Sequence, residues 1–217
     1  MAYKEKVIIG DCTLLLGDCR DIIKSVGEWQ SVISDPPYGM RFVSNRRIEN
    51  YKAINNDDDV CMLQWCCDLS ASHSKYIFCR WDNLFDVPRP KSFITWVKNC
   101  HSMGDLKHEH GRKTEGILFY DGEKHKWPNG RPNDVVKNSN RHLSKLHPTE
   151  KPVDLMCQVC SWTCGTIIDP FMGSGSTLVA AAKMRRRAIG IENDPDYFVI
   201  AVERVRNEYR QGDFFYG

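Results

Sequence analysis

Short apolar runs recur along the chain, separated by polar or glycine-containing segments. Most span four or five residues, are rich in Val, Ile and Phe, and end abruptly, which is typical of buried β-strands. The run at 31–34 ends at Asp35-Pro36-Pro37, where neither proline can donate a hydrogen bond to a strand ladder. We therefore expect extended segments at 7–9, 31–34, 75–79, 93–97, 116–120, 166–169 and 188–192.

Segments in which apolar positions recur every three or four residues lie between these runs and predict helices. The expected helices span 14–23, 60–72, 153–164, 176–186 and 196–208. Residues 42–59 are polar and irregular, and 121–145 are expected to be a loop because they are rich in Gly, Pro, Asn and Lys. Strands alternating with helices predict a single α/β domain over residues 1–217, with a mostly parallel sheet and helices on both faces.

A glycine-containing turn joins the strand at 166–169 to the helix that begins near Ser176. In α/β proteins a turn in this context brings a nucleotide-like ligand to a helix N-terminus. Gly173 and Gly175 allow close backbone approach, and Ser176 or Thr177 can cap the helix. The turn reads Asp169-Pro170-Phe171-Met172-Gly173-Ser174-Gly175-Ser176-Thr177.

Glu192 ends the next predicted strand, 23 residues after Asp169. A carboxylate in this place can accept both hydroxyls of a ribose. The glycine spacing fits neither the dinucleotide fingerprint nor the phosphate-binding P-loop. A cofactor without a pyrophosphate is therefore favoured, with a purely structural glycine turn as the alternative.

Asp35-Pro36-Pro37-Tyr38 follows a predicted strand and so lies at the carboxyl edge of the sheet, where α/β folds bind ligands. An exocyclic amino nitrogen of adenine or cytosine is a poor nucleophile because its lone pair is delocalised into the ring. A carboxylate such as Asp35 can accept a hydrogen bond from that amino group and free the lone pair. The prolines fix the backbone so that a carbonyl can be a second acceptor, and Tyr38 offers a flat face for an extruded base. The alternative is an ordinary turn.

Together the two motifs resemble those of the amino-methyltransferases of bacteria and their phages. Their order resembles that of the β group of this family, in which the catalytic motif precedes the cofactor motif in a circularly permuted, Rossmann-like methyltransferase fold. The resemblance implies S-adenosylmethionine as the cofactor and adenine N6 in double-stranded DNA as the methyl acceptor. It places Asp35, Pro36, Pro37 and Tyr38 at the target base. It assigns to the cofactor site Asp169, Phe171, Gly173, Ser174, Gly175, Ser176, Thr177, Glu192, Asn193, Asp194 and Tyr197.

Two further segments resemble parts of the cofactor site in that family. His147-Pro148-Thr149-Glu150-Lys151-Pro152 resembles the segment that borders the methionine end of the cofactor, which implies roles for His147, Thr149 and Lys151. Gly10-Asp11-Cys12 resembles the N-terminal element on the adenine side and implies roles for Asp11 and Cys12. A second copy, Gly17-Asp18-Cys19, leaves this match open, although the first copy follows an apolar run and is preferred.

The formal net charge is only +2, so the distribution of charge is more informative. The segment from Lys98 to Lys145 holds ten Lys and Arg against six Asp and Glu, a local excess of four positive charges. It occupies the position of the target-recognition region of the family, and its charges can contact phosphates. Candidates for reading base edges are Asn129, Arg131, Asn133, Asn138 and Arg141. Many relatives dimerise, so the resemblance also implies a possible homodimer.

The ten cysteines are spread through apolar segments of a chain without an export signal, and we expect buried free thiols. Cys157, Cys160 and Cys164 are expected on one helix face. A zinc site there would need a fourth ligand, for which His147 is nearest, so no metal is expected. Direct displacement at a sulfonium methyl also needs none. Because no apolar run approaches the roughly 20 residues that span a bilayer, we expect a cytoplasmic protein without membrane segments.

Three other functions are compatible with parts of this pattern. N4-cytosine methylation is the nearest, because the geometry around a cytosine amino group is almost the same; family members with Ser in place of Asp35 tend toward cytosine. Methylation of RNA or of a protein glutamine more often goes with Asn-Pro-Pro-Tyr or Asn-Pro-Pro-Phe and the opposite motif order. A non-catalytic DNA-binding module with the S-adenosylmethionine fold is the third, and the intact Asp35 and Tyr38 disfavour it.

Overall fold

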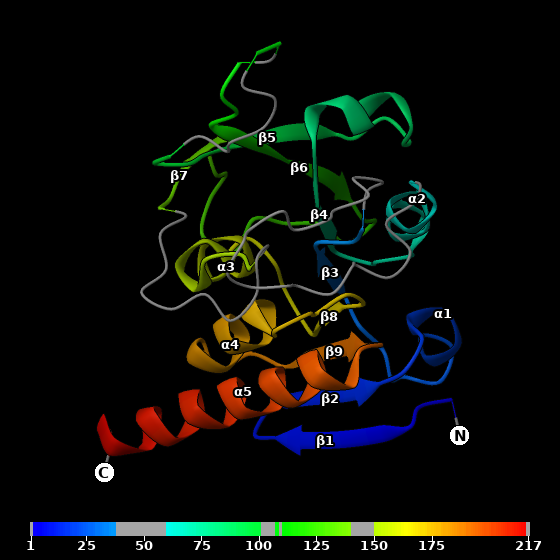
Figure 1. Cartoon of the computed structure of the whole chain (residues 1–217), viewed down its shortest axis with the longest axis vertical. Helices are drawn as coiled ribbons and strands as arrows, with labels where there is room; N and C mark the ends of the chain where they lie inside the picture. Colours follow the sequence, from blue (N-terminus) through cyan, green and yellow to red (C-terminus); the bar gives the residue numbers. More distant parts are fainter. Residues whose placement is uncertain (1, 38–59, 101–106, 109, 140–149, 216–217) are drawn as a thin grey trace.

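A single nine-stranded sheet crosses the part of the chain that the structure describes (Figure 1). The structure is a computed structural model and describes residues 2–37, 60–100, 107–108, 110–139 and 150–215. The strand order is β1-β2-β9-β8-β3-β4-β6-β5-β7. The strands are β1 Glu5–Ile9, β2 Cys12–Leu16, β3 Ser31–Ser34, β4 Ser74–Cys79, β5 Ser92–Val97, β6 Thr114–Asp121, β7 Val135–Lys137, β8 Ile167–Asp169 and β9 Ala188–Glu192.

The five central strands β2, β9, β8, β3 and β4 are all parallel, so their carboxyl ends meet at one edge of the sheet. The direction is reversed in β1, which pairs antiparallel with β2, and in β6, which lies antiparallel between β4 and β5. β7 is parallel to β5. The expected mostly parallel α/β sheet is confirmed. The edge that collects the carboxyl ends is called the catalytic edge below, because the residues predicted to be catalytic follow β3 there.

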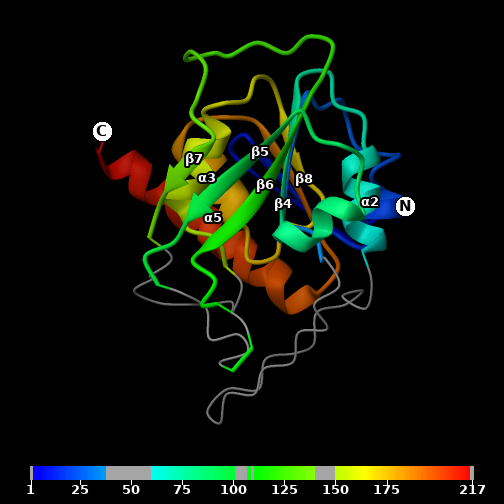
Figure 2. The same cartoon turned by 90° about the horizontal axis from the view of Figure 1, so that it is seen from above.

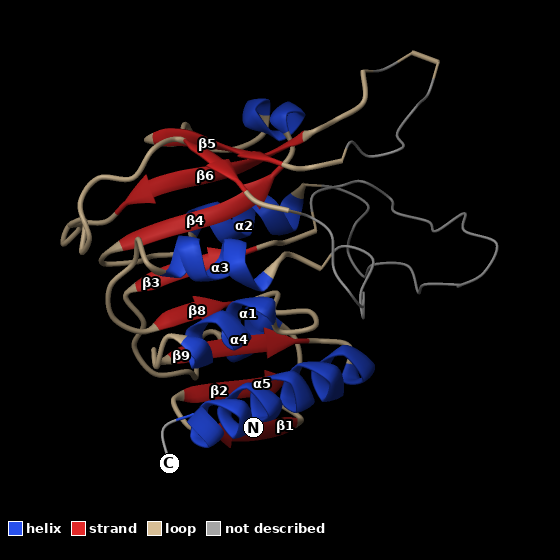
Figure 3. Cartoon of the chain, turned by 90° about the vertical axis from the view of Figure 1, so that its left-hand side faces the viewer, coloured by secondary structure: helices blue, strands red, loops and turns tan. Residues whose placement is uncertain are grey.

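Helices cover both faces of this sheet, as predicted (Figure 2). α3, α4 and α5 lie across one face, which Figure 3 shows from their side, and α1 and α2 lie on the other. Each face has its own hydrophobic core because successive strand residues point to opposite sides. The helices are α1 Cys19–Ile22, α2 Cys61–Asp68, the 3-10 helix η1 Trp81–Phe85, α3 Val153–Cys160, α4 Ser176–Lys183 and α5 Pro195–Phe215.

The predicted helix at 14–23 is wrong in its first half. Residues 12–16 form β2, where Leu14 and Leu16 pack on one face and Leu15 on the other. Three consecutive leucines fit a strand buried on both faces as well as a helix, so their periodicity does not separate the two. Asp18 then begins α1, since its carboxylate accepts a hydrogen bond from the Arg20 backbone amide at 2.9 Å.

Two smaller predictions also need correction. The expected loop at 121–145 contains β7, in which Val136 is buried between exposed neighbours, and three residues are too few to give a periodic signal. The helix after Pro152 ends at Cys160, so Cys164 is not on the face that holds Cys157. All ten cysteines are described and none forms a disulfide, and burial raises the pKa of the Cys160 thiol; Cys61, in contrast to the expected buried thiols, is exposed. The predicted irregular segment at 42–59 lies outside the described residues.

Close packing of β9 against α4 depends on the missing side chain at Gly190. An added methyl group there would clash with Met172 Sδ and lie 2.7 Å from Leu178 Cδ1, and both side chains are buried in the core. We expect Gly190→Ala to lower the free energy of unfolding by about 1–3 kcal/mol, because an overpacked core must shift. Urea denaturation measures this. Gly27→Ala is the matched control, since no described atom lies within 4 Å of the added methyl; an equal loss in both variants would contradict the packing argument.

Candidate active site

Three acidic residues follow or end neighbouring parallel strands at the catalytic edge. Asp35 follows β3, Asp169 ends β8 and Glu192 ends β9. Because β3 pairs with β8 and β8 with β9, the motif near the start of the chain and the motif near its end lie side by side. The two motifs are joined directly, since Ser34 Oγ donates a hydrogen bond to Asp169 Oδ1 at 3.0 Å.

Asp169 is a buried anchor of the glycine turn. Its Oδ1 also accepts from the Phe171 backbone amide at 3.1 Å, and its Oδ2 accepts from Thr177 Oγ1 at 2.5 Å. Burial raises the pKa of Asp169 to about 7, against the opposing effect of these hydrogen bonds. Its carboxylate therefore ties the end of β8 to the first turn of α4, and it shapes the turn from inside.

The glycine turn leaves open space beside the backbone. Gly173 and Gly175 have φ angles of 52° and 85°, in the left-handed region that favours glycine. A Cβ built on Gly175 would lie 2.9 Å from Ala201 Cβ, which fixes the turn closely against α5. A Cβ built on Gly173 meets no described atom within 4 Å, so the turn opens to a ligand at this residue.

Glu192 borders the same space. Its Oε2 accepts a hydrogen bond from the Gly173 backbone amide at 2.9 Å, and its Oε1 accepts from the Asp194 amide at 2.8 Å. Burial raises its pKa, and these backbone donors oppose the increase. Asp194 in turn caps α5, with its Oδ1 accepting from the Asp196 amide at 2.8 Å; Tyr197 is half-buried on the first turn and Asn193 is exposed.

Arg204 on α5 connects the glycine turn to the segment that precedes α3. Its Nη1 donates to the Ser174 carbonyl at 2.7 Å and to Ser174 Oγ at 2.8 Å, and its Nη2 donates to Glu150 Oε1 at 2.5 Å. Burial lowers the pKa of Arg204, and Glu150 opposes this change. Arg204 was not among the predicted site residues, because an arginine 30 positions beyond the turn carries no local sequence signal.

Lys151 reaches the catalytic motif. Its Nζ lies 2.5 Å from Asp35 Oδ2 and 2.9 Å from Glu115 Oε1 on β6. No described residue donates a hydrogen bond to Asp35 Oδ1, although this oxygen is buried. Burial raises the pKa of Asp35; Lys151 lowers it and Glu115 raises it further. The next residue, Pro36, is buried, so the backbone after the carboxylate is fixed by packing as well as by its ring.

The structure does not bring every predicted site residue to this edge. Asp11 and Cys12 lie where β2 begins, which is the opposite edge, and Cys12 is buried with its thiol 3.6 Å from the Leu178 carbonyl. The alternative copy, Asp18, follows the end of β2 and lies beside Glu192, whose carbonyl accepts from the Gly17 amide at 2.8 Å. Tyr38, His147 and Thr149 lie outside the described residues.

A family model for DNA methylases, covering N6 and N4 methyltransferases, matches residues 30–203. The chain belongs to this DNA methylase family. The matched range contains the Asp35 motif, the glycine turn and Glu192, so both halves of the candidate site lie within the family match. Enzymes of the family use S-adenosylmethionine, and the open space at Gly173 beside the Glu192 carboxylate fits a nucleoside of this kind.

Solved structures support the same assignment. The crystal structure of M1.HpyAVI with S-adenosylmethionine matches with a TM-score of 0.69 and 25% identity, over 89% of this chain and 98% of that one. The PvuII DNA methyltransferase, described as cytosine-N4-specific, matches with a TM-score of 0.67 over 96% of this chain and 95% of that one. At 14% identity, this second match shows the fold alone.

Two curated relatives match over shorter segments. The type II methyltransferase M.ScaI of Streptomyces caespitosus is 42% identical over 65 residues, which are 29% of this chain and 21% of the relative. M2.LlaDCHI of Lactococcus lactis subsp. cremoris is 35% identical over 74 residues, which are 33% of this chain and 27% of the relative. The matches therefore span well under half the length of either type II enzyme.

Strands β6 and β7 interrupt the expected recognition region, residues 98–145, and its described parts lie at opposite edges of the sheet. Lys98 and Asn138 follow the ends of β5 and β7 at the catalytic edge, where the Trp96 indole donates to the Asn138 carbonyl at 3.1 Å. Asn129 belongs to the β6–β7 connection at the opposite edge, where its amide donates to the Ser161 carbonyl at 3.2 Å; Arg131 and Asn133 lie in the same connection. Arg141 lies outside the described residues.

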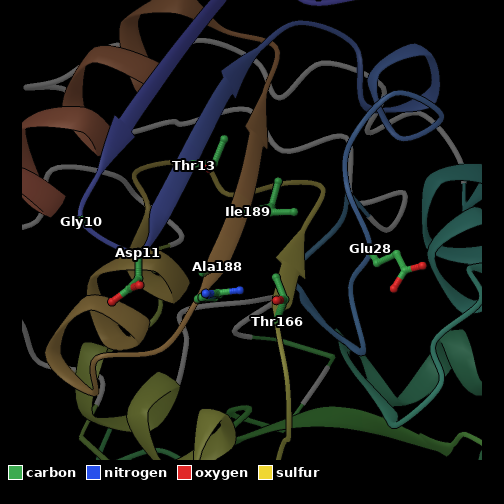
Figure 4. Close-up of a pocket in the computed structure, with 8 residues that line it drawn as sticks. Gly10, Asp11, Thr13, Glu28, Thr166, Ala188 and Ile189 are labelled. Atoms are coloured by element: carbon green, nitrogen blue, oxygen red, sulfur yellow. The ribbon is translucent and has the colours of Figure 1, made fainter.

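The opposite edge also holds a surface pocket of about 300 Å³ (Figure 4). Asp11 and Thr13 from the start of β2 line it together with Ala188 and Ile189 from the start of β9. Neither the glycine turn nor Asp35 contributes to it. In the described parts of the methylase, no helix is long and apolar enough to cross a membrane, and no three His, Cys, Asp or Glu side chains form a group that could hold a metal ion.

The Arg204–Glu150 pair is expected to stabilise the methylase through its burial. Arg204→Met should lower the free energy of unfolding by about 3 kcal/mol, because it removes the guanidinium group that pairs with the buried Glu150 carboxylate. In the double variant Arg204→Met/Glu150→Gln the loss should be smaller than the sum of the single losses. Denaturant unfolding measures both, with the exposed Arg206→Met as the matched control. Additive losses would show that the pair is not coupled.

Proposed function

We propose that this protein transfers the methyl group of S-adenosylmethionine to the exocyclic N6 of adenine in double-stranded DNA. The observation that carries the proposal is the buried Asp35 oxygen to which no described residue donates, at the same edge as the open glycine turn. The two are linked through Ser34 and Asp169, so a base held at Asp35 and a cofactor held at Gly173 lie at neighbouring strand ends. Such positioning of two reactants is a large part of catalysis in a direct displacement.

Each residue has a distinct task in this reaction. S-adenosylmethionine supplies an electrophilic methyl group on a sulfonium, which leaves as a neutral thioether. Glu192 holds the nucleoside part by accepting hydrogen bonds from its ribose hydroxyls, and the turn at Gly173 leaves room for it beside the backbone. Asp35 Oδ1 accepts a hydrogen bond from the amino group, which frees the nitrogen lone pair for the new N–C bond. The same oxygen is an acceptor for the proton that the methylated nitrogen then loses.

The rest of the Asp-Pro-Pro-Tyr motif is assigned by the resemblance. Pro36 and Pro37 keep the backbone after Asp35 rigid, which suits a carbonyl as a second acceptor for the amino group. Tyr38 is proposed to stack on the extruded base. Double-stranded DNA as substrate, a homodimer, a cytoplasmic location and a bacterial or phage source remain predictions.

The second candidate is N4-cytosine methylation. It is supported by the fold match to the PvuII enzyme, whose printed description is cytosine-N4-specific. Asp35 favours adenine, since relatives with serine at this place tend toward cytosine. A non-catalytic DNA-binding module is disfavoured, because burying a carboxylate oxygen to which no described residue donates is costly and a binding module does not require it.

Asp35→Asn tests the role of the carboxylate. We expect the rate of methyl transfer from radiolabelled S-adenosylmethionine to unmethylated bacterial genomic DNA to fall by at least about a hundredfold, since the amide cannot replace the charged acceptor. The fold should persist, because Lys151 keeps Glu115 as a partner at 2.9 Å. The exposed Asp121→Asn, at the other end of β6, is the control. Equal rates for wild type and Asp35→Asn would remove the assigned role.

The base that is methylated is tested on the product. Digestion of the methylated genomic DNA to nucleosides, followed by chromatography and mass spectrometry, should show N6-methyladenine. N4-methylcytosine as the only product would contradict the adenine assignment and leave the methyl-transfer proposal standing. Absence of any methylated nucleoside, with radiolabel in neither base, would contradict both.

A further inference from the structure

Four charged side chains of alternating sign form a continuous chain that ends at Asp35. Lys98 Nζ lies 2.5 Å from Glu115 Oε2, and Glu115 Oε1 lies 2.9 Å from Lys151 Nζ. Lys151 Nζ then lies 2.5 Å from Asp35 Oδ2. Three of the residues come from outside the Asp-Pro-Pro-Tyr motif: from the end of β5, the start of β6 and the segment before α3.

This row of four charged side chains, called the charge chain below, is largely removed from water. The exposed fractions of the side chains are 7% for Lys151, 10% for Glu115, 19% for Lys98 and 22% for Asp35. Aromatic rings lie against both cations: Lys151 Nζ is 5.1 Å from the centre of the Phe78 ring and Lys98 Nζ is 4.9 Å from that of Trp96. Burying four charges is costly, and Lys151 alone would neutralise Asp35. The burial of the other two charges, Glu115 and Lys98, therefore requires a separate explanation.

We propose that Glu115 and Lys98 are positioning residues that divide the charge of Lys151 between two carboxylates and so set how strongly Asp35 accepts a hydrogen bond from the target amino group. This inference rests on the proposed methyl transfer. A carboxylate bound by Lys151 alone would be a weaker acceptor, because its charge would be more fully neutralised. Glu115 competes for the same ammonium group, and Lys98 limits that competition by giving Glu115 a second cation.

The directions of the pKa shifts agree with this geometry. Burial acts to raise the pKa of Glu115, but Lys151 and Lys98 outweigh it and hold that pKa below its usual value. Among the described residues Asp35 has one direct cation, Lys151, and burial together with the nearby Glu115 charge raises the pKa of Asp35. Lys98 acts on Asp35 from further away and lowers its pKa. Two other groups face Asp35 from neighbouring strands, the Asp169 carboxyl on β8 and the Cys79 thiol on β4.

Removing the two charges should therefore have opposite effects. Asp35 works as an ionised acceptor, so the rate falls as the pH decreases through its pKa. Glu115→Gln removes a negative charge near Asp35, so that Lys151 pairs more fully with Asp35. This lowers the pKa of Asp35 and moves the acid limb of the pH dependence of kcat/KM to lower pH. Lys98→Met removes a positive charge, so that Lys151 is the remaining described cation beside Glu115 and neutralises Asp35 less. This raises the pKa of Asp35 and moves the acid limb to higher pH. We expect about half a pH unit or more in each direction.

The same two strands provide matched controls. Lys91 precedes β5 and Asp121 ends β6, and they form an exposed ion pair at 3.5 Å on the opposite edge. Lys91→Met and Asp121→Asn repeat the same changes of charge on the same strands and should leave the acid limb in place. Lys98→Arg keeps the positive charge and should restore the wild-type limb, which a purely steric role of Lys98 would not predict.

A second measurement follows Asp35 without any methyl transfer. Protein labelled with ¹³C at the aspartate carboxyl carbons is titrated by NMR, and the Asp35 signal is assigned as the one missing in Asp35→Asn. Opposite shifts of its pKa in Glu115→Gln and Lys98→Met would support the inference. Shifts in one direction, or none, would overturn it; if Glu115→Gln does not fold, the Lys98→Met result decides alone. Wild-type protein that methylates nothing but titrates as expected would refute the proposed function and leave the charge chain intact.

Discussion

The hydrogen bond from Ser34 Oγ to Asp169 Oδ1 is the point on which the site depends. It joins two motifs that are more than a hundred residues apart in the chain, and it forms only because β3 and β8 are neighbouring parallel strands. In a parallel pair both carboxyl ends lie at one edge, so the residues that follow the strands, Asp35 and the glycine turn, must face the same space. The permuted order of the motifs is thus immaterial to the geometry.

Much of this arrangement could be predicted from the sequence, because its signals are local. The strands at 31–34, 166–169 and 188–192 are apolar runs with abrupt ends, and each is followed by the residues that form the site. The predicted helix at 14–23 was wrong in its first half because three consecutive leucines are compatible with either a helix or a strand. In the structure Leu14, Leu15 and Leu16 fill both faces of β2. The position of β2 also bears on the choice between the two Gly-Asp-Cys copies. If 12–16 had been predicted as a strand, Asp18 would have been preferred to Asp11. α/β folds bind ligands at the carboxyl ends of strands, and Asp18 follows β2 whereas Asp11 precedes it.

The residues that were missed share a different property. Arg204, Glu115 and Lys98 act through partners on other elements, and their contacts are set by the sheet order and by the packing of α5 on the glycine turn. An arginine within a helix or a glutamate at a strand end has no sequence neighbour that reveals its partner. Lys151 was assigned to the cofactor by resemblance, and in the structure its ammonium group lies 2.5 Å from the Asp35 carboxylate. Only the three-dimensional fold brings these charges together.

The acids at the catalytic edge differ in what satisfies them, and this difference explains where the chemistry can occur. Asp169 accepts from hydroxyls and a backbone amide, and Glu192 accepts from two backbone amides, so the oxygens of both carboxyls have neutral donors within the fold. Asp35 instead shares a cation at one oxygen and keeps the other free of described donors. A buried acceptor without a donor is costly in a folded protein, and it is retained where a substrate supplies the donor. The amino group of a base is a donor of the required kind, and in the proposed reaction it donates to this oxygen.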